Sequence, residues 1–481
     1  MGTGVPILHA KEEEPMLKPD LSVSEPRLRQ LLHAGQNFDS IARPVVLHGR
    51  RAAFFLIDGF VKDELFEKIL EYLYGLSDDS LFASPDAFVD GAIPYCETAL
   101  EGDEDKVVTA VLSGQTALLI DGFDRAVLID IRTYPQRDTS EPDKDKTFRG
   151  SRDGFVETMV LNCALIRRRI RSPRLRMEAF QVGSESKTDV TLCYMDGRVD
   201  TALLQKVQDK LKTTPVPALT MNQESLAEVL LPHKWYNPFP KFKYTERPDT
   251  AAAQVLEGDI IILVDNSPSA MMIPTSIFDI MEEANDYYFP PITGTYLRLT
   301  RFFVLVLMLL LTPVWLLLIQ NPAWVPPWLG FIFLQENPFV PVFWQLLILE
   351  VGIDGLKLAT LNTPNMLTTS LSVIAGIVVG DFAVKSGWFS AEPMLYMAIV
   401  ALGSYNQPSW ELGYSFKFLR IMLLVLTYLF NLWGLLAGLA AVFVMLLMNK
   451  TFAGTSYLYP LIPLDLNVLR KKLFRPSIHR Q

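Results

Sequence analysis

The sequence predicts an α/β N-terminal part with two subdomains, followed by an all-α polytopic membrane domain. Apolar stretches long enough to cross a bilayer occur only after residue 296, whereas strand-length apolar runs alternate with amphipathic helices before it. Residues 1–300 carry 33 Lys and Arg against 46 Asp and Glu, and residues 301–481 carry 11 against 7. An acidic first part favours a soluble cytoplasmic domain and argues against a nucleic-acid partner.

The first subdomain is predicted at residues 41–138, after a flexible, proline-interrupted tail at residues 1–40. Alternating apolar residues indicate a strand pair at Pro44–His48 and Ala52–Ile57. Asp63–Leu76 has the apolar spacing of an amphipathic helix. Further strand hairpins are expected where an apolar run ends in Asp and a turn residue, once before Arg125–Ile131 and once before Ala270–Pro274.

The second subdomain and a membrane-proximal joint are predicted at residues 147–295. Asp153 is expected to cap a helix with Glu157 in its first turn, because acids suit a helix N-terminus. Four basic residues crowd the end of this helix: Arg167, Arg168, Arg169 and Arg171. They are typical of a solvated helix end, and the alternative is a docking surface for an acidic subunit or lipid head groups.

The segment Glu246-Arg247-Pro248-Asp249 lies between the soluble part and the first span and is a candidate coupling segment. Arg247 is expected to pair with an acid of the α/β part while Asp249 caps the following helix. The alternative is a capped surface helix without a coupling role.

The membrane domain is predicted at residues 296–450 and a basic tail at residues 451–481. It contains five hydrophobic segments, at residues 302–319, 339–361, 365–384, 393–403 and 421–448. The loop Gln320–Pro338 has no Lys or Arg, which places it outside and residues 1–300 in the cytoplasm. A cytoplasmic tail then needs an even number of crossings. Either a hairpin within residues 421–448 or a non-crossing segment at residues 393–403 would provide it.

Three ionisable residues, Glu350, Asp354 and Lys357, lie in the second hydrophobic segment at spacings that place them on one helical face. Each charge at membrane depth costs at least about 2.5 kcal/mol, so this face must meet protein or water. The residues are therefore candidates for a pore lining or a subunit interface. Two arrangements remain open. In the first, Glu350 belongs to a buried ion network and pairs most simply with Lys357 of a neighbouring chain. In the second, a carboxylate lines a water-filled path and attracts cations.

The sequence lacks the common motifs for catalysis and for cofactor binding. The sequence has no phosphate-binding loop, dinucleotide fingerprint, HExxH or GxSxG motif, and its five histidines are scattered. The three cysteines have no CxxC spacing. We therefore expect no enzyme activity, no metal and no cofactor.

Three stretches carry a family resemblance: Arg149–Ile170 (RGSRDGFVETMVLNCALIRRRI), Pro240–Pro274 with PKFKYTERPD and LEGDIIILVDNSP, and Phe339–Val384. They resemble the spore germination family of germinant-receptor A subunits (GerA type), and YTERPDTA and VDNSPS are similar to one paralogue of these subunits. The resemblance implies a protein of the endospore inner membrane with a cytoplasmic two-part N-terminal domain. Its membrane domain is implied to assemble as a pentameric ion channel that releases monovalent cations.

The implied partners are further copies of the chain, together with germinant-receptor subunits or a small membrane partner subunit. A departure from the family pattern concerns the second span, LLILEVGIDGLKLATL, where Glu350 matches an acidic position and the stretch with Asp354 and Lys357 differs from the pattern. The alternative functions are a secondary transporter, suggested by the polar break at Asn406–Pro408, and a non-conducting scaffold of a germination complex.

Overall fold

The computed structural model describes residues 16–93, 97–134, 147–231, 236–335, 339–362, 373 and 382–475. The chain forms two compact units. The first comprises residues 1–146, 151–232 and 244–273, and the second comprises residues 147–150, 233–243 and 274–481. The predicted transmembrane domain therefore belongs to a larger unit, which also includes the segments before the first span and the C-terminal tail.

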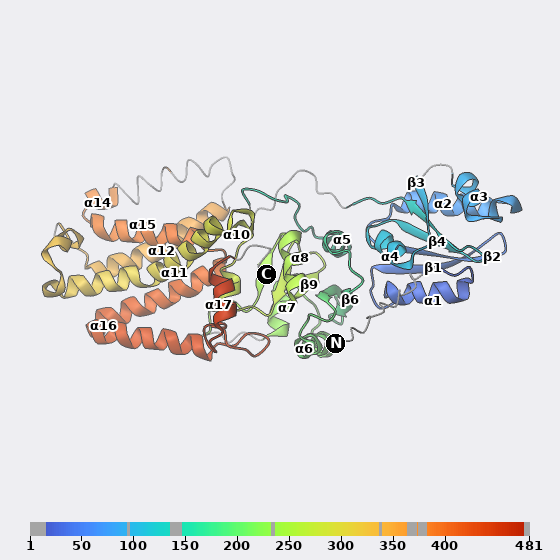
Figure 1. The fold of residues 1–481 in the computed structure, drawn as a ribbon. Coiled ribbons are helices and arrows are strands. Elements are labelled where there is room, and N and C mark those ends of the chain that lie inside the picture. Colours follow the sequence, from blue (N-terminus) through green and yellow to red (C-terminus); the bar gives the residue numbers. More distant parts are fainter. Residues whose placement is uncertain are drawn as a thin grey trace, which may run out of the picture. The chain divides into compact units, whose positions relative to one another are not determined.

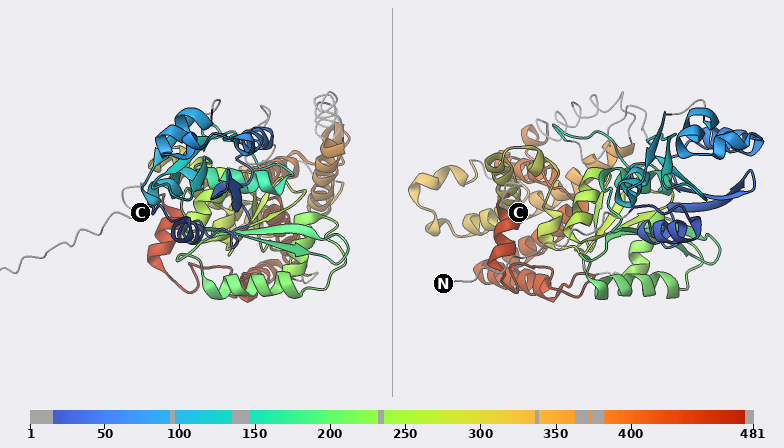
Figure 2. Two further views of the ribbon diagram at one scale, coloured as in Figure 1. Left: turned by 90° about the vertical axis from the view of Figure 1, so that its right-hand side faces the viewer. Right: turned by 45° about the vertical axis from the view of Figure 1, so that its right-hand side comes forward.

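The first unit contains two five-stranded sheets, drawn in blue to cyan and in green in Figures 1 and 2. The first sheet has the order β1-β2-β4-β5-β3, and each of its strands pairs antiparallel with its neighbour. Its strands are β1 (Ser40–Leu47), β2 (Arg50–Ile57), β3 (Glu97–Glu101), β4 (Thr116–Ile120) and β5 (Ala126–Asp130). The predicted strand pair and the hairpin before Arg125 are thus confirmed.

Both faces of the first sheet are covered by helices. On β2, Phe55 packs with helices α1 (Leu21–Leu31) and α4 (Glu104–Leu112), and Phe54 packs on the other face with α2 (Asp63–Gly75) and α3 (Pro85–Ala92). Helix α2 confirms the predicted amphipathic helix. Helix α1 corrects the prediction of a flexible tail to residue 40, because Leu21 and Leu28 are buried in the core. Proline and polar residues lower the average hydropathy of this stretch, but the apolar residues at helical spacing still give it one buried face.

The second sheet has the order β6-β7-β9-β10-β8. Its strands are β6 (Leu175–Val182), β7 (Thr188–Met195), β8 (Lys243–Thr245), β9 (Ile260–Val264) and β10 (Ala270–Ile273). Helices α5 (Met159–Arg169) and α8 (Pro248–Glu257) share one hydrophobic core with it. Helices α6 (Thr201–Thr213) and α7 (Asn222–Leu230) contact β6 and β9 respectively.

The predicted start of α5 is wrong. The helix begins at Met159, six residues after Asp153, and its N-cap Thr158 makes no side-chain cap bond. The Asp153 carboxylate instead accepts hydrogen bonds from Arg169 at the other end of the helix, at 2.5 and 2.7 Å. A guanidinium group forms stronger, charge-assisted hydrogen bonds with this carboxylate than the backbone N–H groups of a helix N-terminus do.

The second unit is helical. Its longer helices are α11 (Pro291–Gln320), α12 (Val342–Asn362), α15 (Ala391–Tyr405), α16 (Trp410–Met448) and α17 (Leu466–Leu473). Shorter elements are α9 (Ile277–Ile280), α10 (Asn285–Tyr288), α14 (Ala383–Lys385) and the 3₁₀ turns η2 (Pro322–Trp324) and η3 (Pro327–Ile332). Among the described residues, α11 and α16 are long and apolar enough to cross a membrane. The predicted span 365–384 lies almost entirely outside the described residues.

Helix α16 is a hairpin of two antiparallel arms, side by side in Figure 1. The chain reverses at Asn431, whose backbone has φ 54° and ψ −136°. A Cβ on Gly438 would lie 2.5 Å from the Leu423 side chain, although these residues would be about 22 Å apart in a straight helix. The structure therefore has the hairpin that was considered within residues 421–448.

The two ends of this helical bundle are fixed by polar contacts. At one end, Asn321 after α11 and Asn431 exchange side-chain amide hydrogen bonds at 2.7 and 3.3 Å. At the other end, Asn237 donates to Asn449 at 3.0 Å, and Arg298 donates to the carbonyl of Lys472 at 2.8 Å. The C-terminal tail therefore lies at the end of the bundle where α11 begins, which we call the entry end.

Candidate functional site

The three ionisable residues of α12 face the first arm of α16 within one chain. Arg420 grips Glu350 with two parallel hydrogen bonds, Nε to Oε1 at 2.6 Å and Nη2 to Oε2 at 2.8 Å. Its remaining nitrogen, Nη1, donates to the Met308 carbonyl of α11 at 3.1 Å. Glu350 and Arg420 are both buried, and their paired, hydrogen-bonded geometry is what makes a buried ion pair tolerable.

Lys417 extends this pair to the next acid of α12. Its ammonium donates to the Glu350 carbonyl at 2.9 Å, lies 3.7 Å from Glu350 Oε2 and pairs with Asp354 Oδ2. Because Lys417 and Arg420 are three residues apart and Glu350 and Asp354 four apart, two helical faces of opposite charge meet. The other oxygen of Asp354, Oδ1, is buried without a hydrogen-bond partner among the described residues.

Lys357 lies in an aromatic surrounding. Its ammonium donates to Ser404 Oγ at 2.8 Å and lies 5.1 Å from the ring centre of Tyr405. The rings of Trp410 and Tyr414 are 5.9 and 5.8 Å away. These distances are those of cation–π contacts, which hold α12 against the break between α15 and α16.

A small cavity of about 30 Å³ lies among these groups, lined by residues of α11, α12, α15 and α16. Glu350, Asp354, Lys357, Lys417 and Arg420 all contribute to its wall. Its volume is enough for about one water molecule. With two acids and three bases, the wall has a formal charge of +1, so it does not form an acidic cation site by itself.

The structure thus places Glu350, Asp354 and Lys357 together, as the sequence predicted, but with different partners. Glu350 pairs with Arg420 of the same chain. Sequence reasoning missed Lys417 and Arg420 because it began the last span at Ile421. The signal was present in WELGYSFKFLRIML, where two bases lie three residues apart immediately before an apolar run.

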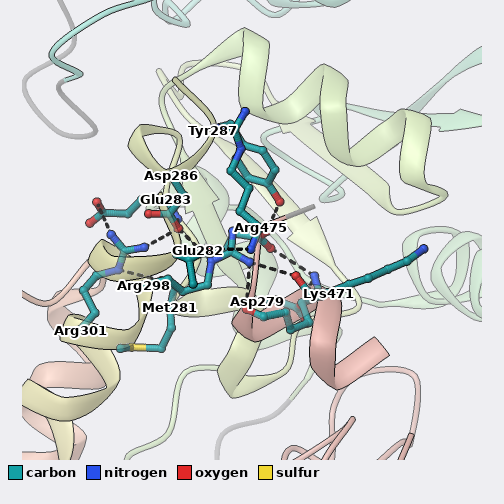
Figure 3. A network of polar contacts seen from close by, with 12 residues as sticks. Asp279, Met281, Glu282, Glu283, Asp286, Tyr287, Arg298, Arg301, Lys471 and Arg475 are labelled. Carbon is teal, nitrogen blue, oxygen red and sulfur yellow. Dashed lines mark hydrogen bonds and ion pairs between the residues drawn. The ribbon is translucent and has the colours of Figure 1, made fainter. Parts of the chain in front are cut away.

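A second charged cluster lies at the entry end and is drawn in Figure 3. The buried Asp286 accepts from Arg298 Nε at 3.1 Å and also pairs with Arg301. Arg298 Nη2 reaches Glu282 at 3.0 Å, and Arg301 Nη1 reaches Glu283 at 3.0 Å. These two arginines of the first turns of α11 are therefore fixed to the segment that precedes the helix.

The pKa of Glu282 is lowered to about 2. Burial alone would raise it, but the charges of Lys472, Arg298 and Lys243 and a hydrogen bond from Tyr287 outweigh burial. Lys472 approaches Glu282 at 3.1 Å and Asp279 at 2.7 Å. The C-terminal helix α17 is therefore part of this cluster.

In the candidate coupling segment, Asp249 is not the predicted cap of the following helix. Arg247 is buried and binds Asp249 of its own segment, Nε to Oδ1 at 3.0 Å and Nη2 to Oδ2 at 2.6 Å. Arg247 is also the N-cap position of α8, and no side chain caps that helix. Arg247 Nη2 reaches the Ser151 carbonyl at 2.9 Å, and the Glu246 carbonyl accepts from Phe155 N at 2.8 Å. Residues 246–249 are thus bonded to the RGSRDG stretch.

The arginines at the end of α5 do not form one exposed surface. Arg167 is fully buried and binds Asp39 at 2.9 and 3.0 Å, which joins α5 to the start of β1. Arg169 pairs with Asp153. Arg168 and Arg171 are exposed, and the Arg168 guanidinium lies 4.4 Å from the ring centre of Tyr134. The docking-surface hypothesis is therefore corrected for Arg167, whose carboxylate partner lies inside the unit.

No group of three or more His, Cys, Asp or Glu side chains suited to a metal occurs in the part of the chain that the structure describes. Cys163 and Cys193 are free and buried.

Comparison with known proteins gives a consistent set of similarities. Residues 27–481 match the family model described as Bacillus/Clostridium GerA spore germination protein. Stage V sporulation protein AF of Bacillus subtilis is 34% identical over 97% of this chain and 94% of its own length. Spore germination protein A1 of Bacillus subtilis is 28% identical over 74% of each chain.

One solved structure is also similar. It is the N-terminal domain of the A subunit of the Bacillus megaterium spore germinant receptor GerK3, with a TM-score of 0.41 and 24% identity. The match covers 54% of this chain and 97% of that one.

Proposed function

Because this chain belongs to the GerA family of spore germination proteins, which are membrane proteins and not enzymes, we propose that it is the channel-forming subunit of an oligomeric ion channel. The channel releases monovalent cations and mediates or amplifies the germination response. Its site is the inner membrane of the endospore, with the N-terminal unit in the cytoplasm. Its partners are further copies of the chain, as a pentamer, and a small membrane subunit or germinant-receptor subunits.

The observation that carries this proposal is the ion network between α12 and α16. Membrane proteins retain intramembrane charges mainly where ions, protons or structural pairs need them. Glu350 is neutralised by Arg420 and so acts as an anchor for α12. Asp354 pairs with Lys417 through Oδ2 and lines the cavity, and its Oδ1 has no hydrogen-bond partner among the described residues. Asp354 is therefore the better candidate for contact with a permeating cation.

The size of the cavity supports an oligomeric path. A volume of about 30 Å³ holds about one water, which is too little for a continuous aqueous pore through the described residues of one chain. A conducting path then needs surfaces from several chains. On α12, Val351, Gly352 and Gly355 are exposed on the side away from the paired charges, and this face is available for such a path.

A secondary transporter is the second candidate, favoured by the same occluded polar cavity beside the break between α15 and α16. The mass of the full-length complex in mild detergent separates the two. A ring of several copies supports the channel, whereas a monomer that stays monomeric over a wide concentration range contradicts it.

The segment Glu246, Arg247 and Asp249 is proposed to couple the N-terminal unit to the membrane helices. Its bonds to Ser151 and Phe155 connect it to the start of the second subdomain. Replacing Arg247 by Ala should reduce germination while the abundance of the protein in spores stays similar. If abundance falls in parallel with germination, the segment is structural only.

A further inference from the structure

Helix α17 is held at the entry end by hydrogen bonds and ion pairs on one of its sides, and its other side is exposed. Arg298 Nη1 donates to the carbonyls of Lys471 and Lys472 at 3.2 and 2.8 Å. Lys472 turns inward to Asp279 and Glu282, and Arg475 N donates to Thr295 Oγ1 at 3.1 Å. These contacts hold α17 against the first turns of α11 (Figure 3).

The contact points give the depth of α17 relative to a bilayer. The apolar run of α11 begins at Phe302, so Arg298 lies about 6 Å and Thr295 about 10 Å outside it along the helix axis. The head-group layer on each side of the hydrocarbon core is about 5–7 Å thick. The residues of α17 that are bonded to Arg298 therefore lie at the level of the phospholipid head groups, and Arg475, bonded to Thr295, lies just outside this layer.

The outer side of α17 combines apolar and basic residues. Leu466, Arg470 and Phe474 follow one another at four-residue spacing and are exposed, with Leu466 68% and Phe474 50% exposed. Lys471 is exposed beside them, and its side chain extends away from the charged cluster in Figure 3. Leu464, 61% exposed, precedes the helix. Of these three successive basic residues, Lys472 forms ion pairs within the charged cluster, whereas Arg470 and Lys471 are exposed.

We propose that the outer side of α17 binds the surface of a bilayer that contains anionic phospholipids. Leu466 and Phe474 pack among the lipid head groups, and Arg470 and Lys471 contact the lipid phosphates. A protein partner would not require this depth, whereas apolar residues flanked by bases at head-group level are the pattern of an interfacial helix. The surface is independent of the proposed channel activity.

Hydrogen exchange of the backbone amides of residues 466–474 tests this in full-length protein in nanodiscs. Nanodiscs of phosphatidylcholine alone are compared with an equal mixture of phosphatidylcholine and phosphatidylglycerol. Each base near an anionic surface favours binding about fivefold, so two bases should slow exchange about 30-fold in the anionic discs. Raising the salt from about 0.05 to about 0.5 M should remove most of this protection.

Two variants complete the test. Arg470→Gln/Lys471→Gln should lose the lipid-dependent protection. Lys62→Gln/Lys68→Gln, which removes the exposed base that precedes α2 and an exposed base within it, should keep the protection. Equal exchange in both lipids, or protection in the anionic discs that salt leaves unchanged, would overturn the proposal. Protection that rises with protein concentration in both lipids would also overturn it, because a second copy would then be the occupant.

Discussion

Arg420 holds Glu350 through two parallel N–H···O bonds of 2.6 and 2.8 Å, although the residues are 70 positions apart in the chain. Both side chains are about 3% exposed. The pair joins α12 to the first arm of α16, and the bond from Arg420 to the Met308 carbonyl adds α11. Three helices of the second unit are therefore fixed to one another through a single guanidinium group.

A double-mutant cycle should reveal this pairing. Glu350→Gln leaves the Arg420 charge buried without a counter-charge, and losing one partner of a buried pair costs roughly 3–5 kcal/mol. The double variant Glu350→Gln/Arg420→Gln should melt at a higher temperature than either single variant, because no unpaired charge remains. Asp354→Asn should cost less, since Asp354 is 29% exposed. Thermal unfolding of the purified variants, with Arg420→Gln as the second single variant, measures these changes. A loss of stability in the double variant equal to the sum of the losses in the two single variants would contradict the pairing.

The α16 hairpin predicts a contrast between two helical glycines. A Cβ on Gly434 would lie 1.9 Å from the Leu426 carbonyl oxygen, so Gly434→Ala should force the two arms apart and lower the melting temperature. Gly413→Ala in the first arm meets nothing within 4 Å. That variant should be neutral or more stable, by up to about 1 kcal/mol from helix propensity. Equal melting temperatures for the two variants would contradict the hairpin packing.

Acid should weaken the entry-end cluster within a defined window. The folded pKa of Glu282, about 2, is below its ordinary value of 4.5, so its contribution to stability is complete above pH 4.5 and is lost as pH falls through 2. The full contribution is on the order of 3 kcal/mol.

Melting temperatures recorded between pH 7 and pH 2 check this expectation. Glu282→Gln should be less stable at neutral pH and should lose much of the decline below pH 4.5. The matched control Glu71→Gln removes an exposed carboxylate of α2 and should follow the parent curve. A Glu282→Gln curve that runs parallel to the parent throughout would show that Glu282 does not carry the charge assumed here.

The arrangement of the second unit predicts a topology. A reporter fused after residue 330 should be external, whereas reporters at residue 250 and after residue 481 should both be cytoplasmic. The last expectation follows from α17, which is bonded to the first turns of α11. Opposite locations for residues 250 and 481 would contradict it.

Local sequence patterns predicted most of the fold. Strands such as Ala52–Ile57 and the helix at Asp63 were predictable because alternating or helical apolar spacing reflects burial directly. Helix starts were less predictable: Asp153 and Asp249 both look like caps, yet each binds an arginine, Arg169 or Arg247. Which partner an acid takes depends on the tertiary fold, and propensity does not contain that information.

The acidic and basic residues of α12 in the candidate site were predictable from the sequence, but their partners on α16 were not predicted. The face of Glu350, Asp354 and Lys357 followed from helical spacing, and the need for a polar partner followed from the cost of charge in a membrane. Lys417 and Arg420 were missed because an apolar window begins after them. A search for a complementary pair of bases at helical spacing would have found them beside the apolar run that follows.

Release of K⁺ from sealed vesicles that contain the purified full-length protein tests the central claim most directly. A channel should empty each vesicle that holds one complex in a single fast event, and Asp354→Asn should slow release while the oligomer stays intact. Slow, saturable exchange, or no K⁺ release from a folded oligomer, would contradict the proposal that this chain forms an ion channel.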